Sequence, residues 1–306
     1  MIYTVTLNPA IDYHMWLPSP PQAGKMTPLK TLCTAGGKGI NVSIILKNLG
    51  YPSLATGFFG GFTGSYLRDF LQSSNIENDF ISIEEASRIN AKLHWQEGEC
   101  EIPGTAPKIP QQAWRALLDK MEALKKGDFL VLSGSLPGGL PDDAYAQILS
   151  LVQPRGIDVF VDTSGSALKQ IIDKKPFAIK PNHHELAELV GQKESLDIQT
   201  NLGFARDLFE KGIQNVIVSL GEAGAVLVNK EGAFHAQTPK GEVQNTIGAG
   251  DSLVAGFIAA HMEKNAVAGD ALALAAACGT ATAFSGHLAE KEMIESVRKK
   301  VKITNL

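Results

Sequence analysis

The chain has 306 residues, of which 44% are hydrophobic and 20% are charged, and this composition can bury a substantial core. A formal net charge of −4, with dispersed basic residues, argues against binding to nucleic acid or to an anionic membrane. Three cysteines without metal-like spacing indicate reduced thiols, and no secretory pattern opens the chain, so we expect a cytoplasmic protein.

Apolar strand-like runs alternate with helical patterns along most of the chain. We expect strands at residues 2–7, 54–59, 129–132, 159–161, 177–179 and 216–219, and in the last third at 225–229 and 233–236. We expect helices near 42–50, 64–74, 111–125, 142–152, 165–173, 183–190, 202–211, 250–263, 267–285 and 290–300. This order predicts a single α/β domain over residues 1–306, with a mainly parallel sheet covered by helices.

Two stretches interrupt this alternation with additional short strands. Residues 13–17 and 30–34 form one such pair, and residues 90–96 and 99–102 form another, joined by a tight turn around Glu97-Gly98. We therefore expect two inserted segments, at about 13–34 and 88–104, to build a small β-sheet that stands off the main domain as a lid.

Asp12 ends the run Asn8-Pro9-Ala10-Ile11-Asp12, directly after the first strand pattern. Open parallel sheets bind ligands at the carboxyl ends of their strands, so Asp12 is a candidate ligand-binding residue. The alternative is a structural Asx turn after Pro9.

A glycine-rich run, Ala35-Gly36-Gly37-Lys38-Gly39-Ile40-Asn41, precedes the helical pattern at 42–49. It would place the charge of Lys38 in a backbone cradle and the amide of Asn41 at the helix start, where such donors suit polyols and phosphates. A purely structural turn is the alternative.

Arg88, Asn90 and Lys92 occupy alternate positions of a strand-like run, so all three side chains project from one face. Two cations and an amide on one face suit a sugar phosphate. The alternative is a solvated face whose charges protect an edge strand from aggregation.

The run Ile247-Gly248-Ala249-Gly250-Asp251-Ser252-Leu253 opens a late helical pattern. Its glycines let backbone N–H groups converge, and the first helical turn adds unpaired N–H groups and the positive end of the helix dipole. Such a segment can bind an anion, and Asp251 can take a proton from an attacking hydroxyl. Simple capping of the helix by Asp251 is the alternative.

Together these runs resemble the PfkB family of carbohydrate kinases, and within it the branch of 1-phosphofructokinases and tagatose-6-phosphate kinases. The resemblance covers almost the whole chain and rests on residues 6–12, 36–42, 133–137, 180–182 with Glu185, 219–221 and 248–252. It implies the ribokinase-like three-layer αβα sandwich with a β-sheet lid. It also implies the use of ATP and Mg²⁺, and a homodimer formed through the lid.

The resemblance assigns a role to each matching residue. Asp251 would be the catalytic base, and the backbone of Gly248, Ala249 and Gly250 would form the anion hole. Lys38 would lie close to the substrate phosphate, in a substrate set of Asp12, Gly36, Gly37, Lys38, Asn41, Arg88, Asn90 and Lys92. The nucleotide would contact Lys180, Asn182, Ser219, Gly221, Gly224, Ala277 and Gly279. Glu185 would hold Mg²⁺ mainly through water.

Structural alternatives exist for several of these positions. Residues 219–224 also fit an ordinary hairpin turn, and tight helix packing explains the small residues Ala277 and Gly279 equally well. A zinc site at His184 and Glu188 lacks a third ligand at suitable spacing.

The expected reaction is phosphorylation of a ketohexose monophosphate, above all of fructose 1-phosphate at O6 to fructose 1,6-bisphosphate. Tagatose-6-phosphate kinase is the nearest alternative, and a non-catalytic sugar-phosphate sensor is an alternative of another class. Ile44 stands where relatives often carry arginine, which removes a possible second cation near the sugar phosphate. The chain has neither a GxxxxGK[ST] run nor a GxGxxG run after the first strand, which argues against a Walker-type or dinucleotide fold.

Overall fold

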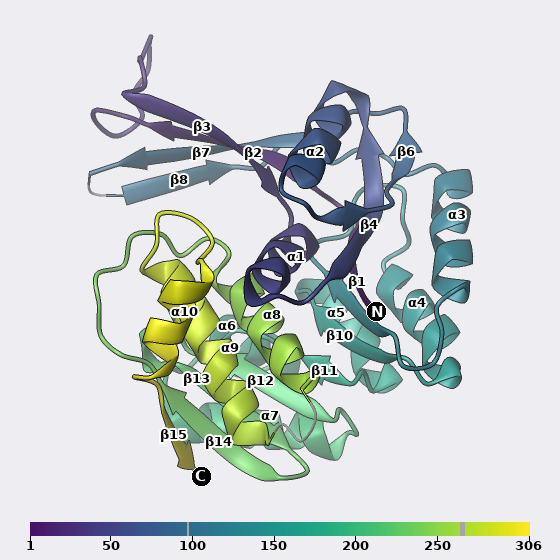
Figure 1. The fold of residues 1–306 in the computed structure, drawn as a ribbon, viewed down its shortest axis with the longest axis vertical. Helices are drawn as coiled ribbons and strands as arrows, with labels where there is room; N and C mark the ends of the chain where they lie inside the picture. Colours follow the sequence, from purple (N-terminus) through teal and green to yellow (C-terminus); the bar gives the residue numbers. More distant parts are fainter. Residues whose placement is uncertain (97, 264–266) are drawn as a thin grey trace.

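A large β-sheet forms the middle layer of the computed structural model, which describes residues 1–96, 98–263 and 267–306 (Figure 1). Its strands are β1 (Ile2–Thr6), β4 (Ser53–Gly60), β5 (Glu77–Asn78), β6 (Ile81–Ile83), β9 (Phe129–Ser133), β10 (Asp158–Asp162), β11 (Ala178–Ile179), β12 (Asn215–Ser219), β13 (Ala225–Asn229), β14 (Gly232–Gln237) and β15 (Lys302–Asn305). In the described residues the order is β15-β14-β13-β12-β11-β10-β9-β1-β4-β5, with β6 beside β4. Pairs from β5 and β6 through to β12 are parallel and those from β12 to β15 antiparallel, which confirms a mainly parallel sheet.

Helices cover both faces of this sheet. One face carries α3 (Gln111–Glu122), α4 (Ala144–Val152), α5 (Gly165–Ile171), α6 (His183–Val190) and α7 (Ile198–Glu210). The other carries α1 (Lys38–Leu49), α8 (Ala249–His261), α9 (Ala268–Ala283) and α10 (Lys291–Arg298), while α2 (Gly61–Ser73) packs on β4. Short 3₁₀ turns lie at Gln153–Arg155, Ile172–Lys174 and Gly221–Ala223. Across the described ranges, none of the helices is long and apolar enough to cross a membrane.

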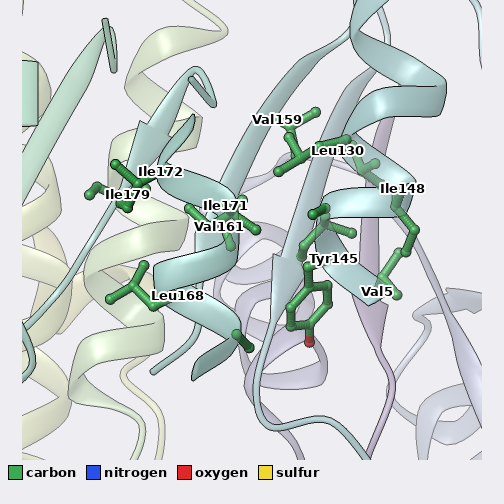
Figure 2. Packing of buried hydrophobic residues seen from close by; sticks show 14 of the residues in the cluster. Val5, Leu130, Tyr145, Ile148, Val159, Val161, Leu168, Ile171, Ile172 and Ile179 are labelled. Carbon is green, nitrogen blue, oxygen red and sulfur yellow. The ribbon is translucent and has the colours of Figure 1, made fainter. Parts of the chain in front are cut away.

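Alternate residues of the central strands point into two separate cores. Leu130 of β9 packs in one core with Tyr145 of α4 (Figure 2), and Leu132 belongs to the same core. Val131 packs in the other core with Leu253 of α8. A strand turns successive side chains to opposite faces, so a sheet covered on both sides needs apolar residues at consecutive positions. The expected three-layer αβα architecture is confirmed.

Four strands form a second, small sheet that extends away from the main sheet (Figure 1). The order is β3-β2-β7-β8, with β2 (Ala10–Trp16), β3 (Lys30–Gly36), β7 (Arg88–Trp95) and β8 (Gly98–Ile102). Strand β2 pairs antiparallel with β3 and parallel with β7, so that Asp12 lies opposite both Thr34 and Asn90. The turn expected at Glu97-Gly98 falls partly on residue 97, outside the described residues.

The boundaries differ from the sequence expectations at identifiable places. Helix α1 begins at Lys38 rather than near residue 42, because Gly37 has a φ of 127° and acts as its N-cap. Strands β5 and β6 have two and three residues, which is too short for a period-two pattern to show. Strand β15 lies at the sheet edge, and only Ile303 of its four residues is apolar.

Candidate active site

The amino end of α8 carries the Gly248-Ala249-Gly250-Asp251 run. Gly248 is the N-cap with a φ of 78°, and a Cβ there would lie 2.6 Å from Leu288 Cδ2, so the position requires glycine. The N–H of Ala249 donates to a preceding carbonyl at 3.2 Å. The backbone of Ala249 was expected to contribute to the anion hole, but its N–H already has a partner. The first-turn N–H groups that lie outside the helical hydrogen-bond pattern are those of Gly250 and Asp251.

Asp251 lies in the first turn of α8 and is only 6% exposed. Its Oδ2 accepts a 2.7 Å hydrogen bond from Nδ2 of Asn41, in the first turn of α1. Burial raises the pKa of Asp251 to about 6, although the nearby ammonium of Lys38 opposes the rise. A buried carboxylate that titrates close to neutrality has the properties of a general base.

Asp162, the last residue of β10, joins two lysines at the same edge of the sheet. Its side chain has no exposed surface, and its Oδ2 and Oδ1 lie 3.3 Å from the Nζ atoms of Lys38 and Lys180. Burial acts to raise the pKa of Asp162, but the ammonium groups of Lys180 and Lys38 outweigh it and hold the pKa below its usual range. Asp162 in turn raises the pKa of Lys38, so this lysine stays charged beside Asp251.

Lys38 forms an ion pair with Asp162 within the protein itself. Its ammonium is held by a carboxylate of the main domain and acts electrostatically on Asp251. A contact between Lys38 and the substrate phosphate stays a prediction, whereas its place at the centre of the site is observed.

Asn182 and Glu185 form a complete capping box at the start of α6. The Asn182 Oδ1 accepts from the Glu185 N–H at 2.8 Å, and Glu185 Oε2 accepts from the Asn182 N–H at 2.9 Å. Ser219, at the end of β12, donates its N–H to the Pro181 carbonyl at 3.1 Å. The structure therefore brings Lys180, Asn182, Glu185 and Ser219 together, and the capping box by itself explains the spacing of Asn182 and Glu185.

The remaining predicted nucleotide residues have clear structural roles. Gly224 has a φ of 89°, and a Cβ there would lie 1.9 Å from the Ala236 carbonyl, so the turn after Gly221 demands glycine. A Cβ at Gly279 would lie 3.0 Å from the Ala249 carbonyl, and Ala277 is fully buried in the core. These contacts favour the packing interpretation for Ala277 and Gly279, and nucleotide contacts at these residues stay predictions.

The small sheet presents Asp12 at the point where it joins the main domain. Asp12 Oδ1 accepts from Asn90 Nδ2 at 2.8 Å, and Lys92 Nζ lies 3.7 Å from Oδ2. Burial raises the pKa of Asp12 in spite of the Lys92 charge. A Cβ on Gly36 would lie 2.5 Å from the Asp12 carboxylate, so Gly36 gives this side chain its room. The expected common face of Asn90 and Lys92 is observed.

Arg88 and Asn8 link the small sheet to the ends of β1 and β9. Arg88 Nη2 donates to the Asn8 carbonyl at 3.3 Å, and Asn8 Nδ2 donates to Ser135 Oγ at 3.0 Å. Among the described residues, Arg88 Nε, Asn8 Oδ1 and Ser133 Oγ are buried without a hydrogen-bond partner. Buried polar atoms are normally satisfied, so this junction carries donors and acceptors suited to a polar ligand.

Sequence reasoning missed two residues of this site. Asp162 was not singled out, although it directly follows the predicted strand at 159–161, whose carboxyl end shares an edge with that of the first strand. Asn8 was part of a motif but received no role. In both cases the signal was a polar residue at the end of an apolar strand.

A cavity of about 430 Å³ lies at the opposite edge of the sheet, lined by Phe177, Asn215 and His261 among others. The amide of Asn215 already donates to the Phe177 carbonyl at 3.1 Å, and burial lowers the pKa of His261. Asp251, Asp162, Lys38 and Lys180 lie at the other edge of the sheet, where the strands β10 and β11 end.

Comparisons with known proteins agree with this geometry. The model of the "pfkB family carbohydrate kinase" matches residues 5–292. The chain is 40% identical to the 1-phosphofructokinase of Bacillus subtilis and 33% identical to the D-tagatose-1-phosphate kinase of Bacillus licheniformis, with 100% of both chains covered in each case. The structure of phosphofructokinase-2 from Escherichia coli in complex with substrates and products matches with a TM-score of 0.93, at 28% identity over 98% of each chain.

The family match spans nearly the whole chain, and the candidate base, the two lysines beside Asp162 and the small sheet all lie within the matched residues. Full-length relatives at 40% and 33% identity carry the names of sugar-phosphate kinases. The chain therefore belongs to the pfkB family of carbohydrate kinases.

Proposed function

We propose that this protein transfers the γ-phosphoryl group of ATP to O6 of fructose 1-phosphate and so forms fructose 1,6-bisphosphate. The observation that carries the proposal is the buried Asp251 carboxylate at the start of α8, hydrogen-bonded to Asn41 and adjacent to the Asp162-bound lysines. The name of the Bacillus subtilis relative, at 40% identity over the full length, supports this choice of sugar phosphate.

Asp251 would accept the proton of the attacking hydroxyl. Its raised pKa of about 6 leaves it ionised at neutral pH and makes it a better proton acceptor than an exposed aspartate. The N–H groups of Gly250 and Asp251, at the positive end of α8, would stabilise the charge on the transferring group. Asp12 and Asn90 would hold sugar hydroxyl groups, and the small sheet would exclude water as a lid.

The residues present fit both ATP and Mg²⁺. Lys180 and Lys38 bring two positive charges to one carboxylate, which suits a polyphosphate beside them. Glu185 uses Oε2 in the capping box, so Oε1 would hold Mg²⁺ through water, and the metal would neutralise phosphate charge. The described residues contain no cluster of three His, Cys, Asp or Glu side chains that could hold a metal ion by themselves.

Tagatose 1-phosphate is the second candidate substrate, because a relative at 33% identity is named D-tagatose-1-phosphate kinase. This sugar differs from fructose 1-phosphate in configuration at C4 and carries its phosphate at the same carbon. Tagatose 1-phosphate is therefore a stronger alternative substrate than tagatose 6-phosphate, and both are included in the test below.

The test measures ADP formation by the purified protein with ATP and Mg²⁺. Fructose 1-phosphate, tagatose 1-phosphate, tagatose 6-phosphate and fructose 6-phosphate are compared by kcat/KM. We expect fructose 1-phosphate to give the highest value. Turnover with none of the four would remove the kinase proposal, and binding without turnover would support a sugar-phosphate sensor instead.

We further propose a homodimer formed through the small sheet. The face opposite Asn90 and Lys92 carries apolar side chains, among them Ile89 at 43% and Ile102 at 55% exposure. Sedimentation should show a dimer that Ile102→Lys weakens, whereas Leu196→Lys, at an equally exposed residue outside this sheet, should leave it intact. A monomeric wild type would contradict this proposal. The cytoplasmic location stays a prediction.

A further inference from the structure

Lys92 of the small sheet is a buried cation between two carboxylates. Its side chain is 6% exposed, and its Nζ lies 3.7 Å from Asp12 Oδ2 and 3.2 Å from Glu101 Oε2. The register of β7 with β8 places Glu101 directly opposite Lys92. The two carboxylates differ in freedom, because the Asp12 side chain is 10% exposed whereas that of Glu101 is 50% exposed.

The charges of the site are not equally available to a substrate. Lys38 and Lys180 are bound to the fully buried Asp162 in the main domain. Asp12 is fixed by Asn90, with Gly36 packed against its carboxylate. Glu101 lies on β8, the edge strand of the small sheet, so its carboxylate can move into water without disturbing the main domain.

We propose that Glu101 is a displaceable counter-ion of Lys92: it neutralises this lysine in the empty site and yields its place to the phosphate of the incoming sugar phosphate. This inference rests on the proposed function, because it requires an anionic sugar. Near pH 7 a sugar phosphate carries close to two negative charges and so competes well with a single carboxylate. An unphosphorylated sugar or a singly charged anion is attracted less strongly to Lys92 and so displaces Glu101 less readily.

Two consequences follow for binding. The sugar phosphate binds more weakly than it would to an unpaired lysine, because binding must first break the Lys92–Glu101 ion pair. It also keeps stray anions such as inorganic phosphate from occupying the buried lysine. Glu101 therefore sets how tightly the small sheet binds a phosphate group, whether that group belongs to the sugar phosphate or to inorganic phosphate.

Glu101→Gln tests this role, because it removes the charge and keeps the size of the side chain. We expect KM for fructose 1-phosphate to fall about two- to fivefold, the effect of a partly exposed ion pair. Competitive inhibition by inorganic phosphate should strengthen by a similar factor, and KM for ATP should not change. If Glu101 only stabilised the small sheet, its replacement by glutamine would not lower KM.

Glu99→Gln is the matched control. Glu99 lies two residues away on the same face of β8, but its carboxylate lies 3.7 Å from His94 Nδ1 and opposite His94 in the register. We expect this variant to keep the KM and the phosphate inhibition of the wild type. A KM that is unchanged or raised in Glu101→Gln, or an equal fall in both variants, would overturn the proposal.

A binding experiment separates this proposal from the proposed function. Calorimetric titration with inorganic phosphate needs no turnover, and Glu101→Gln should bind it about two- to fivefold more tightly than the wild type and Glu99→Gln. If the wild type phosphorylates no ketohexose phosphate, the kinase proposal fails while this comparison still decides the role of Glu101. Equal affinities in all three proteins would refute the counter-ion exchange.

Discussion

Asp162 of the main domain and Lys92 of the small sheet each lie between two groups of opposite charge, but they differ in their freedom to move. Asp162 has no exposed surface, and both of its lysines come from segments packed against the main sheet. The Lys92 side chain is 6% exposed, yet Glu101 is half exposed on an edge strand. The main domain thus holds its charges fixed for chemistry, whereas the small sheet can exchange a partner on binding.

Electrostatic stabilisation of a transition state works best with groups that need no reorganisation during the reaction. Asp251, Asp162, Lys38 and Lys180 meet that condition, because four separate parts of the main domain position them and hold them to one another. Recognition of a substrate, in contrast, tolerates groups that change partners as a lid closes. Substitutions in the two regions should therefore affect different kinetic constants.

The largest effect is expected in the main domain, for Asp251→Asn. Loss of the general base should lower kcat by about 10² to 10⁴, with little change in KM for the sugar phosphate. The near-isosteric amide keeps the fold, which circular dichroism and the melting temperature would verify. Activity within a few-fold of the wild type would exclude Asp251 as the base.

Asp162→Asn should have the next largest effect, on stability as well as on activity. It leaves the ammonium group of Lys180, whose side chain is 5% exposed, without its counter-charge, and breaking a buried ion pair in this way costs about 3 kcal/mol. Urea unfolding measures this loss. Asp119→Asn is the control, because its pair with Arg115 is exposed and should contribute about 0.5 kcal/mol or less.

Gly36→Ala tests the small-sheet side of the comparison. The added Cβ would lie 2.5 Å from the Asp12 carboxylate and force it to shift, so KM for the sugar phosphate should rise about tenfold while kcat changes less. Gly203→Ala places the same methyl group on α7 with no atom within 4 Å. It should behave as the wild type, and equal KM values in the two variants would contradict a role for the position of Asp12.

Much of the fold and of the catalytic end could be predicted from the sequence, because the signals there are local. The alternation of apolar strands and helical patterns dictates a covered parallel sheet, and strand ends point to one shared edge. Gly248 is the N-cap of α8 and Asp251 lies in the first turn of the same helix, so a short run of residues contains both the turn and the carboxylate.

The missed features depend on contacts between distant segments. The pairing of Asp162 with Lys38 and Lys180 joins three separate elements, and the contact of Glu101 with Lys92 depends on the register of β7 with β8. Single-sequence patterns carry no information on such pairings. Strand β15 was missed for a similar reason, since a short, largely polar edge strand is stabilised by its neighbour β14 rather than by its own pattern.

The smallest expected effect concerns the pH dependence of the fixed catalytic end. Because burial raises the pKa of Asp251 to about 6, the base is protonated and inactive below that value. In the wild type, kcat/KM, which reports the pKa of the free enzyme, should therefore fall about tenfold per pH unit below an acid limb near pH 6.

Asn41→Ala should move this acid limb to higher pH by about half a unit. The Asn41 amide donates to Asp251 Oδ2 and stabilises the ionised form, so its removal raises the pKa of the base further. Asn48→Ala, on the same helix but hydrogen-bonded to the Ala289 carbonyl, should leave the limb in place. Because Asn41 is also a candidate sugar ligand, the pH at which the limb of kcat/KM lies, rather than the size of KM, carries the test. A limb that stays put in Asn41→Ala, or shifts to lower pH, would show that this hydrogen bond does not tune the base.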